Sequence, residues 1–235
     1  MSLVTPPEIE RNLRAFSSPQ AVAEFSVYHL FPEEERLFQK YYRPGETVLD
    51  LACGLGRTTL LLHEMGLSVR GVDFSQIFID TAKRRLPYLD LRVGSFHQLE
   101  EADNSFSHVL ISFNGIDYAF PEQQRVTALR ESVRVLRPGG TLIYSSHNLK
   151  SMHFFSPYYS RRLQWKLRNC HKAWRDWAYI MEDGVHAFYA SSSYVVRQSQ
   201  ALGLQLEEMN GFGRLGHGPL DLYFSPYIHY VFRKA

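Results

Sequence analysis

Apolar residues along the chain follow two patterns, short unbroken runs and helical spacings. The short runs predict buried strands near residues 47–52, 68–73, 91–95, 106–113 and 140–147. Amphipathic spacings between them predict helices near residues 57–65, 75–85 and 122–136. Strands and helices that alternate in this way are typical of a parallel sheet with helices on both faces. We therefore expect a doubly wound α/β fold.

The two ends of the chain depart from this alternation. Residues 1–42 mix prolines, serines and charges and predict a helical lead-in with a break near Pro32. Residues 149–186 lack the alternation and are rich in aromatic and basic side chains, so we expect an inserted cap over the fold. No linker-like composition separates these parts, which favours a single domain over residues 1–235.

Within the insertion, a helical spacing of apolar residues extends from 158 to 182. Its members recur at three- and four-residue steps: Leu163, Leu167, Cys170, Trp174, Trp177 and Met181. Basic side chains fall on the opposite face: Arg161, Arg168, Lys172 and Arg175. The pattern predicts a helix packed on the fold with a solvated basic face. It leaves open the recognition of an anionic substrate, a membrane surface or RNA.

The chain closes with another helix and two strands. Ser191 is placed to cap a helix that Gly203 ends. Apolar residues then predict strands at residues 204–209 and 227–233.

Composition narrows the class of protein. Hydrophobic residues make up 45% of the 235 residues and charged residues 21%, as in a globular domain. The formal net charge of +2 argues neither for nor against a nucleic-acid partner. Two cysteines make a disulfide framework unlikely to be the basis of the fold. Without a secretory signal or an apolar run near the roughly 20 residues that span a bilayer, the sequence predicts a cytoplasmic protein.

The most informative stretch runs from Val48 to Gly56, where an apolar run ends in an acid, a small residue and two glycines. Asp50 and Ala52 precede Gly54 and Gly56. Glycine keeps so tight a turn allowed, and without a Cβ it lets a ligand lie against the main chain. The helix expected next directs its first N–H groups at the same space. This order predicts a nucleotide-type binding crevice.

The ligand expected in this crevice is an adenosine compound without phosphates. The dinucleotide fingerprint needs a third glycine three residues after the second, and Thr59 occupies that position. This also disfavours an NAD-linked oxidoreductase. Asp73 ends the next predicted strand, where a carboxylate accepts both ribose hydroxyls and repels a phosphate.

Four successive segments resemble the motifs of the class I S-adenosylmethionine-dependent methyltransferases: VLDLACGLGR, GVDFS, DNSFSHVLISFNGIDY and ALRESVRVLRPGGTLIYSSHN. The resemblance covers roughly residues 45–150. It implies S-adenosylmethionine as cofactor and methyl transfer as the activity. It also implies a Rossmann-like, mostly parallel seven-stranded sheet, in which the last two predicted strands form an antiparallel edge.

By this resemblance, the first turn and the second strand hold the cofactor. Gly54 and Gly56 would let it approach the backbone, and Asp73 would hold the ribose. Ala52 belongs to the same turn. Asp50 either orients the amino group of the cofactor or caps the loop without touching a ligand.

The adenine is expected between Phe74 and the end of the third predicted strand. The family often carries an acid directly after Gly94, where it holds the adenine amino group, but this chain has Ser95 there. A neutral hydroxyl is a weaker partner. Backbone groups near Phe96, together with stacking, are therefore expected to hold the adenine instead.

The segment after the fourth predicted strand is where the family brings the methyl group to the substrate. Phe113 would line this junction on the cofactor side and Asn114 on the substrate side. Asp117 and Tyr118 either face the substrate, with Asp117 a candidate catalytic residue, or serve as a turn cap and a core ring. The segment is not the Asn-Pro-Pro-aromatic signature of base-amino methyltransferases, which disfavours nucleic acid as the substrate.

His147 ends the fifth predicted strand, over the crevice. It could take a proton from a substrate hydroxyl, or it could be structural. Tyr28 and His29, in the lead-in, are further candidates for substrate contact. No histidine, cysteine and carboxylate group has the spacing of a metal site, so we expect no metal.

The sequence thus predicts an S-adenosylmethionine-dependent methyltransferase that acts on oxygen or nitrogen of a small molecule, with an anionic or aromatic acceptor. Two alternatives stay open: an RNA or protein methyltransferase that uses the basic 161–175 segment, and a non-catalytic S-adenosylmethionine-binding scaffold.

Overall fold

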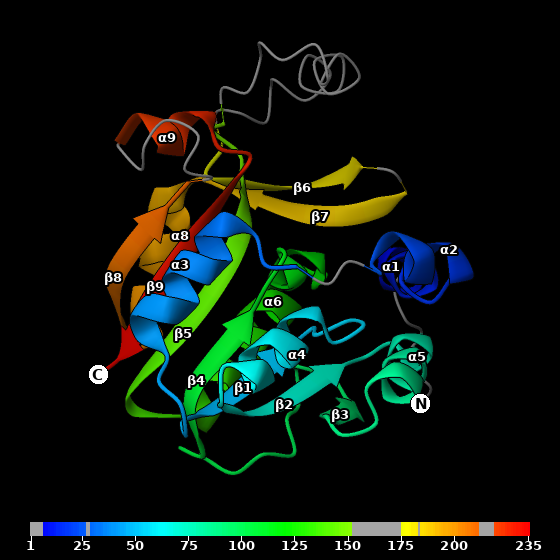
Figure 1. Ribbon diagram of the computed structural model, residues 1–235. Coiled ribbons are helices and arrows are strands. Elements are labelled where there is room, and N and C mark those ends of the chain that lie inside the picture. The colour runs from blue at the N-terminus through cyan, green and yellow to red at the C-terminus, as the bar shows by residue number, and fades with distance from the viewer. Residues whose placement is uncertain (1–6, 27–28, 152–174, 183, 212–218) are drawn as a thin grey trace.

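A computed structural model describes residues 7–26, 29–151, 175–182, 184–211 and 219–235 of the chain. A central sheet runs through the molecule and helices lie on both of its faces (Figure 1).

The first part of the sheet is parallel. Its strands are β1 (Thr47–Leu51), β2 (Ser68–Asp73), β3 (Asp90–Val93), β4 (Phe106–Ile111) and β5 (Leu136–Asn148). They lie in the order β3-β2-β1-β4-β5, and each neighbouring pair is parallel. Strands β2 and β3 are added on one side of β1, and β4 and β5 on the other. This change in the direction of strand order leaves a crevice at the carboxyl ends of β1 and β4. The doubly wound fold is therefore confirmed.

Helices cover the two faces of this sheet because neighbouring strand residues point to opposite sides. The helices next to the parallel strands are α3 (Pro32–Tyr41), α4 (Arg57–Glu64), α5 (Gln76–Arg85) and α6 (Glu122–Val135). Val48 packs in one core with α3 and α4, whereas Leu49 packs in another core with α6. Figure 1 shows these helices on opposite sides of the sheet.

The carboxyl-terminal elements form the expected antiparallel edge. Ser191 caps α8 (Ser192–Gln200), accepting a hydrogen bond from the backbone N–H of Tyr194 at 3.3 Å. Strand β9 (Tyr227–Lys234) pairs antiparallel with β5 on one side and with β8 (Leu204–Asn210) on the other. A short helix, α9 (Pro219–Phe224), precedes β9.

The sheet has nine strands rather than seven, because a hairpin extends it at the end of β5. Its strands are β6 (Trp177–Glu182) and β7 (Val185–Ala190), and β7 runs parallel to the last residues of β5. The predicted helix up to residue 182 is therefore wrong at its carboxyl end. The burial has a period of two: Ala178 and Ile180 are buried, and Met181 is half exposed. Trp177 and Met181 are four residues apart, a spacing that fits one face of a helix and also one face of a strand.

The remainder of the predicted cap helix, including the basic positions 161, 168 and 172, lies outside the described residues. Arg175 is described and is exposed on the segment that leads into β6.

The lead-in is helical, as expected, with α1 (Pro7–Ala15) and α2 (Pro19–Glu24) ahead of α3. Helix α1 contacts the hairpin at β7, and Ala21 of α2 packs with Phe78 of α5, above which Figure 1 shows α1 and α2. The buried side chain of Asn12 anchors α1 to η1 (Gly115–Tyr118) and to β7. Its amide donates to the carbonyls of Tyr118 at 3.1 Å and His186 at 2.9 Å, and its Oδ1 accepts from the backbone N–H of His186 at 2.8 Å.

Candidate functional site

A cavity of about 680 Å³ lies where the carboxyl ends of β1, β2 and β4 meet α1, α2 and the hairpin. Ten residues predicted from the sequence line it: Ala52, Gly54, Asp73, Phe74, Ser95, Phe96, Phe113, Asn114, Tyr118 and His147. Residues from both predicted halves, cofactor and acceptor, therefore meet in one space.

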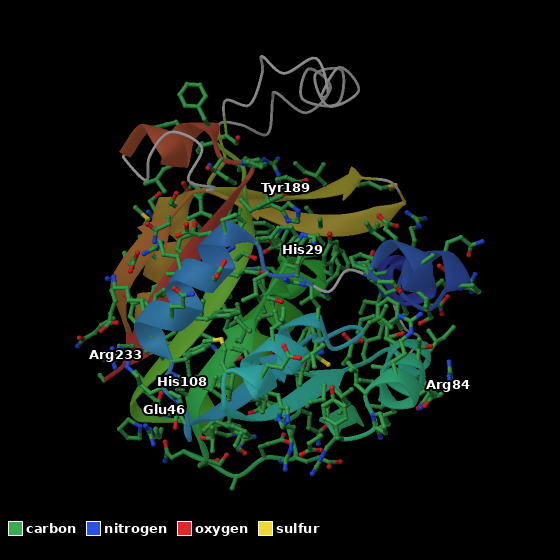
Figure 2. The ribbon with its side chains drawn as sticks, viewed as in Figure 1. His29, Glu46, Arg84, His108, Tyr189 and Arg233 are labelled. Carbon is green, nitrogen blue, oxygen red and sulfur yellow. The ribbon has the colours of Figure 1, made fainter. Side chains whose placement is uncertain are left out.

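Other predicted residues lie elsewhere. Asp50, Gly56 and Asp117 are not on the cavity surface, and His29 is exposed outside it. Tyr28 lies outside the described residues. Figure 2 labels His29, and it also labels His108 with Glu46, which form an ion pair of 2.8 Å away from the cavity.

The first turn is shaped by left-handed backbone. Gly54 has φ +57° and Gly56 has φ +82°, a region that glycine occupies at least cost. A Cβ at Gly56 would meet the side chains of Leu86 and Leu91 at 3.6–3.7 Å, so this glycine faces the protein interior. Its left-handed conformation, rather than close approach of a ligand, explains the glycine there.

Asp50 is hydrogen-bonded to the first turn of the helix that follows, α4. Its Oδ2 accepts hydrogen bonds from the hydroxyls of Thr58 at 2.7 Å and Thr59 at 2.6 Å. Its Oδ1 is buried and has no hydrogen-bond partner. Burial raises the pKa of Asp50 to about 6. The geometry favours the loop-capping alternative over direct contact with a ligand.

Asp73 is held rigidly at the end of β2. Its Oδ2 accepts from the backbone N–H of Gly54 at 2.9 Å, and its Oδ1 accepts from that of Ser75 at 2.8 Å. Burial raises the pKa of Asp73 to about 6, while these two N–H groups act in the opposite direction. The carboxylate is therefore ionised at neutral pH, and each oxygen keeps a lone pair for a ligand on the cavity side.

The cavity also contains a histidine that sequence reasoning missed. His97 lines the cavity, and its Nδ1 lies 3.0 Å from the hydroxyl of Ser95. Its Nε2 is buried without a hydrogen-bond partner, and burial lowers the pKa of His97. Its place two residues after Ser95, where the family often carries an acid, was the signal that could have found it.

The corner after β4 is strained. Phe113 and Asn114 have φ of +49° and +59°, which bulky residues rarely adopt. Gly115 is required here, since a Cβ would lie 2.7 Å from the Cβ of Ala52. Phe113 stacks on Phe31 with centroids 5.5 Å apart. Asn114 is buried, its backbone N–H donates to Ser145, and its Oδ1 has no hydrogen-bond partner.

Asp117 and His147 form a hydrogen-bonded pair beneath the acceptor side. Asp117 lies on η1 (Gly115–Tyr118) and is fully buried. Its Oδ2 accepts from the backbone N–H of His147 at 2.6 Å and from Nδ1 of the ring at 2.8 Å. With Nδ1 engaged by Asp117, Nε2 is the ring nitrogen left for a ligand in the cavity.

Aromatic rings enclose His147. The ring centre of Tyr189 from β7, labelled in Figure 2, lies 4.6 Å from that of His147. The ring centres of Tyr118 and Tyr227 lie 6.1 and 5.9 Å from it. The missed hairpin thus supplies a ring beside His147 and, with Val185 and Ala187, part of the cavity lining. Its contribution could not be predicted, because the segment was interpreted as part of a helix.

The cavity also contains one arginine that the sequence analysis did not single out. Arg57 donates to both carboxylate oxygens of Glu34, at 2.6 and 2.8 Å. Its guanidinium lies 5.0 Å from the ring centre of Phe31. Of the described residues that line the cavity, Arg57 is the only Lys or Arg, and its charge is already compensated.

Two further properties concern the described residues alone. No group of three or more His, Cys, Asp or Glu among them could hold a metal ion. None of the helices they form has the length and apolar character needed to cross a membrane.

The sequence matches to known proteins fall in the parallel half of the fold. Residues 48–140 match the family described as methyltransferase domain. The demethylmenaquinone methyltransferase of Beutenbergia cavernae is 39% identical over 122 residues, 52% of this chain and 49% of that protein. The chain thus spans about half the length of the curated relatives it matches.

Two solved structures share the fold over most of the chain. A S-adenosylmethionine-dependent methyltransferase from Methanosarcina mazei has a TM-score of 0.65 at 17% identity, covering 87% of this chain and 98% of that one. The 1,6-didemethyltoxoflavin-N1-methyltransferase of Burkholderia thailandensis, solved with 1,6-didemethyltoxoflavin and S-adenosylhomocysteine, has a TM-score of 0.67 at 17% identity, covering 100% and 92%. The parallel half of this chain is therefore similar to methyltransferase domains, and the chain shares the fold of S-adenosylmethionine-dependent methyltransferases.

Proposed function

We propose that this protein transfers a methyl group from S-adenosylmethionine to an oxygen or nitrogen atom of a small aromatic acceptor. The observation that carries the proposal is a single cavity that joins Gly54 and Asp73 to His147. Cofactor and acceptor could therefore meet without solvent between them, as a direct displacement requires.

The residues of the first half of the cavity fit the cofactor. Asp73 would accept from the ribose hydroxyls through its remaining lone pairs, and Gly54 leaves the backbone bare beside it. Phe74 and His97 would contact the adenine. When bound, S-adenosylmethionine supplies a methyl carbon that its sulfonium activates toward a nucleophile.

The second half of the cavity fits an aromatic, uncharged acceptor better than an anion. Its described lining contains several rings, and its one guanidinium is already paired with Glu34. The acceptors named in two relatives, demethylmenaquinone and 1,6-didemethyltoxoflavin, are small molecules, which supports the same class here.

His147 is the residue we assign to proton removal. With Nδ1–H donated to Asp117, its Nε2 can accept a proton from the O–H or N–H of the acceptor. Asp117 then stabilises the imidazolium that forms. Asp117 does not reach the cavity, so it is a positioning residue rather than one that touches the acceptor.

The proposal is tested by titration calorimetry with S-adenosylmethionine, followed by a panel of phenols, hydroxyquinones and ring N–H compounds. Release of S-adenosylhomocysteine reports transfer. We expect binding in a 1:1 ratio and turnover with at least one aromatic acceptor. Binding without turnover across the panel would favour a non-catalytic scaffold, and absence of binding would contradict the proposal.

A further inference from the structure

Arg125 is a buried cation directly behind the Asp117–His147 pair. It lies on α6 and is fully buried. Its Nη1 donates to Oε1 of Gln198, whereas its Nε and Nη2 have no hydrogen-bond partner. Its guanidinium carbon lies 4.3 Å from the ring centre of Phe188. A buried guanidinium with two unsatisfied nitrogens is costly and calls for a compensating charge.

Asp117 supplies that charge. The Nε of Arg125 lies 3.7 Å from Oδ1 of Asp117, which is ion-pair distance without a hydrogen bond. Within the described residues, no other carboxylate forms an ion pair with Arg125. Glu122 is nearby, but it accepts from the hydroxyl of Tyr194 and from the amide of Gln198 instead.

The tyrosines around Arg125 are neutral. Tyr144, Tyr179, Tyr194 and Tyr230 all have a raised pKa, chiefly because they are buried, and so keep their protons. Among the described residues, Asp117 is thus the carboxylate within ion-pair distance of the guanidinium, and Glu122 adds a second negative charge beyond that distance.

Besides Asp117, the described residues around His147 supply aromatic rings and a hydroxyl. Tyr118 on η1, Tyr189 on β7 and Tyr227 on β9 contribute rings. Ser146, next in the chain, donates its hydroxyl to Oδ1 of Asp117. The balance between Asp117 and Arg125 thus sets the electrostatic potential at the imidazole.

This balance decides whether His147 can act as a base. An uncompensated carboxylate at 2.8 Å favours the imidazolium, which has no lone pair left to accept a proton. A guanidinium behind the carboxylate offsets that attraction while leaving the hydrogen bond to Nδ1 intact. The ring stays oriented by that hydrogen bond.

We propose that Arg125 is a positioning residue that neutralises Asp117 and so keeps His147 uncharged between turnovers. The inference rests on the proposed function, in which His147 accepts the proton of the acceptor. It deepens that function in one respect: the acceptor enters with its proton, as a hydroxyl or N–H compound, and gives it up to Nε2 within the cavity.

The test compares Arg125→Met with Arg125→Lys. The first removes the charge and the second retains it. Protonation of His147 is followed in the free protein by NMR of labelled imidazoles, with the resonance assigned by the His147→Asn variant. In Arg125→Met, we expect the midpoint of imidazolium formation to move up by about one pH unit, and the acidic limb of kcat/KM to move with it. In Arg125→Lys, both should stay near their wild-type positions.

A merely structural Arg125 would move neither midpoint. Unchanged midpoints in a folded Arg125→Met variant would overturn the proposal. Should that variant not fold, Asp117→Asn is compared with the double variant Asp117→Asn/Arg125→Met, which leaves no unbalanced charge. The double variant should then show the higher midpoint, and equal midpoints would equally overturn the proposal.

These outcomes are separable from failure of the proposed function. The NMR midpoint needs neither cofactor nor acceptor, whereas calorimetry with S-adenosylmethionine tests the function directly. Normal cofactor binding with unmoved midpoints rejects the role of Arg125 alone. Absent cofactor binding with shifted midpoints rejects the methyltransferase activity and leaves the charge balance intact.

Discussion

The two halves of the cavity are built in different ways. The cofactor half, defined by Gly54, Asp73 and Phe74, comes from residues close together in the sequence, and its hydrogen bonds to Asp73 come from backbone N–H groups. The acceptor half, defined by Asn114, Tyr118 and His147, depends on side chains from η1, β5, β7 and β9. The first half is a property of local chain conformation, whereas the second exists only in the folded chain.

The largest effect is expected in the acceptor half. Replacing His147 with asparagine removes the proposed base, so kcat should fall by about 10²–10⁴-fold. Affinity for S-adenosylmethionine should stay unchanged, because the cofactor half is untouched. The exposed His63 provides the matched control, His63→Asn, which should turn over at the wild-type rate. A His147→Asn enzyme with normal kcat would reduce His147 to a packing residue.

A substitution in the cofactor half should instead weaken the binding of S-adenosylmethionine. Asp73→Ala removes the acceptor for two ribose hydroxyls, and affinity measured by calorimetry should fall by about 100-fold or more. Asp80→Ala, on the exposed side of α5, where Asp80 accepts from the amide of Gln76, is the control and should bind normally. Equal affinities for the two variants would refute the role given to Asp73.

The same carboxylate makes cofactor affinity depend on pH. Burial raises the pKa of Asp73 to about 6 in the free protein. As the pH falls through 6, the carboxyl takes up a proton and loses its capacity to accept from the ribose. Affinity should therefore be constant above pH 7 and weaken by up to about tenfold per unit below 6. Asp73→Asn should bind weakly and without this dependence; an identical profile in both proteins would point to another group.

The smallest effect is expected at His97. Its buried Nε2 has no hydrogen-bond partner among the residues that the structure describes. If it contacts the adenine, His97→Ala should weaken cofactor binding by about fivefold, near 1 kcal/mol. Ser95→Ala should act in the same direction, because Ser95 holds Nδ1 of His97. Undiminished affinity in both variants would leave His97 as a neighbour that only packs on Phe96.

The contrast between the halves also explains what the sequence could reveal. Strand and helix positions through residue 136, the glycine turn and Asp73 were predictable, because each depends on local periodicity or on backbone conformation near one residue. The carboxyl-terminal edge at β8 and β9 followed from the same local signals.

The rest depends on contacts between distant segments. The hairpin was missed because Trp177 and Met181 satisfy a helical spacing while lying in a strand. The hydrogen bond between Asp117 and His147 joins residues 30 positions apart. The hydrogen bond between Asn12 and His186 joins residues 174 positions apart. Arg125 carried no signal at all in the sequence, since an arginine on an amphipathic helix is ordinarily exposed.

The most direct measurement is a crystal structure of the protein grown with S-adenosylhomocysteine and an aromatic hydroxyl compound. We expect the ribose on Asp73, the sulfur at the junction beside Asn114, and the hydroxyl of the acceptor within hydrogen-bond distance of Nε2 of His147. The two ligands in separate sites, or the adenosine placed away from Asp73, would contradict a single cavity for both partners.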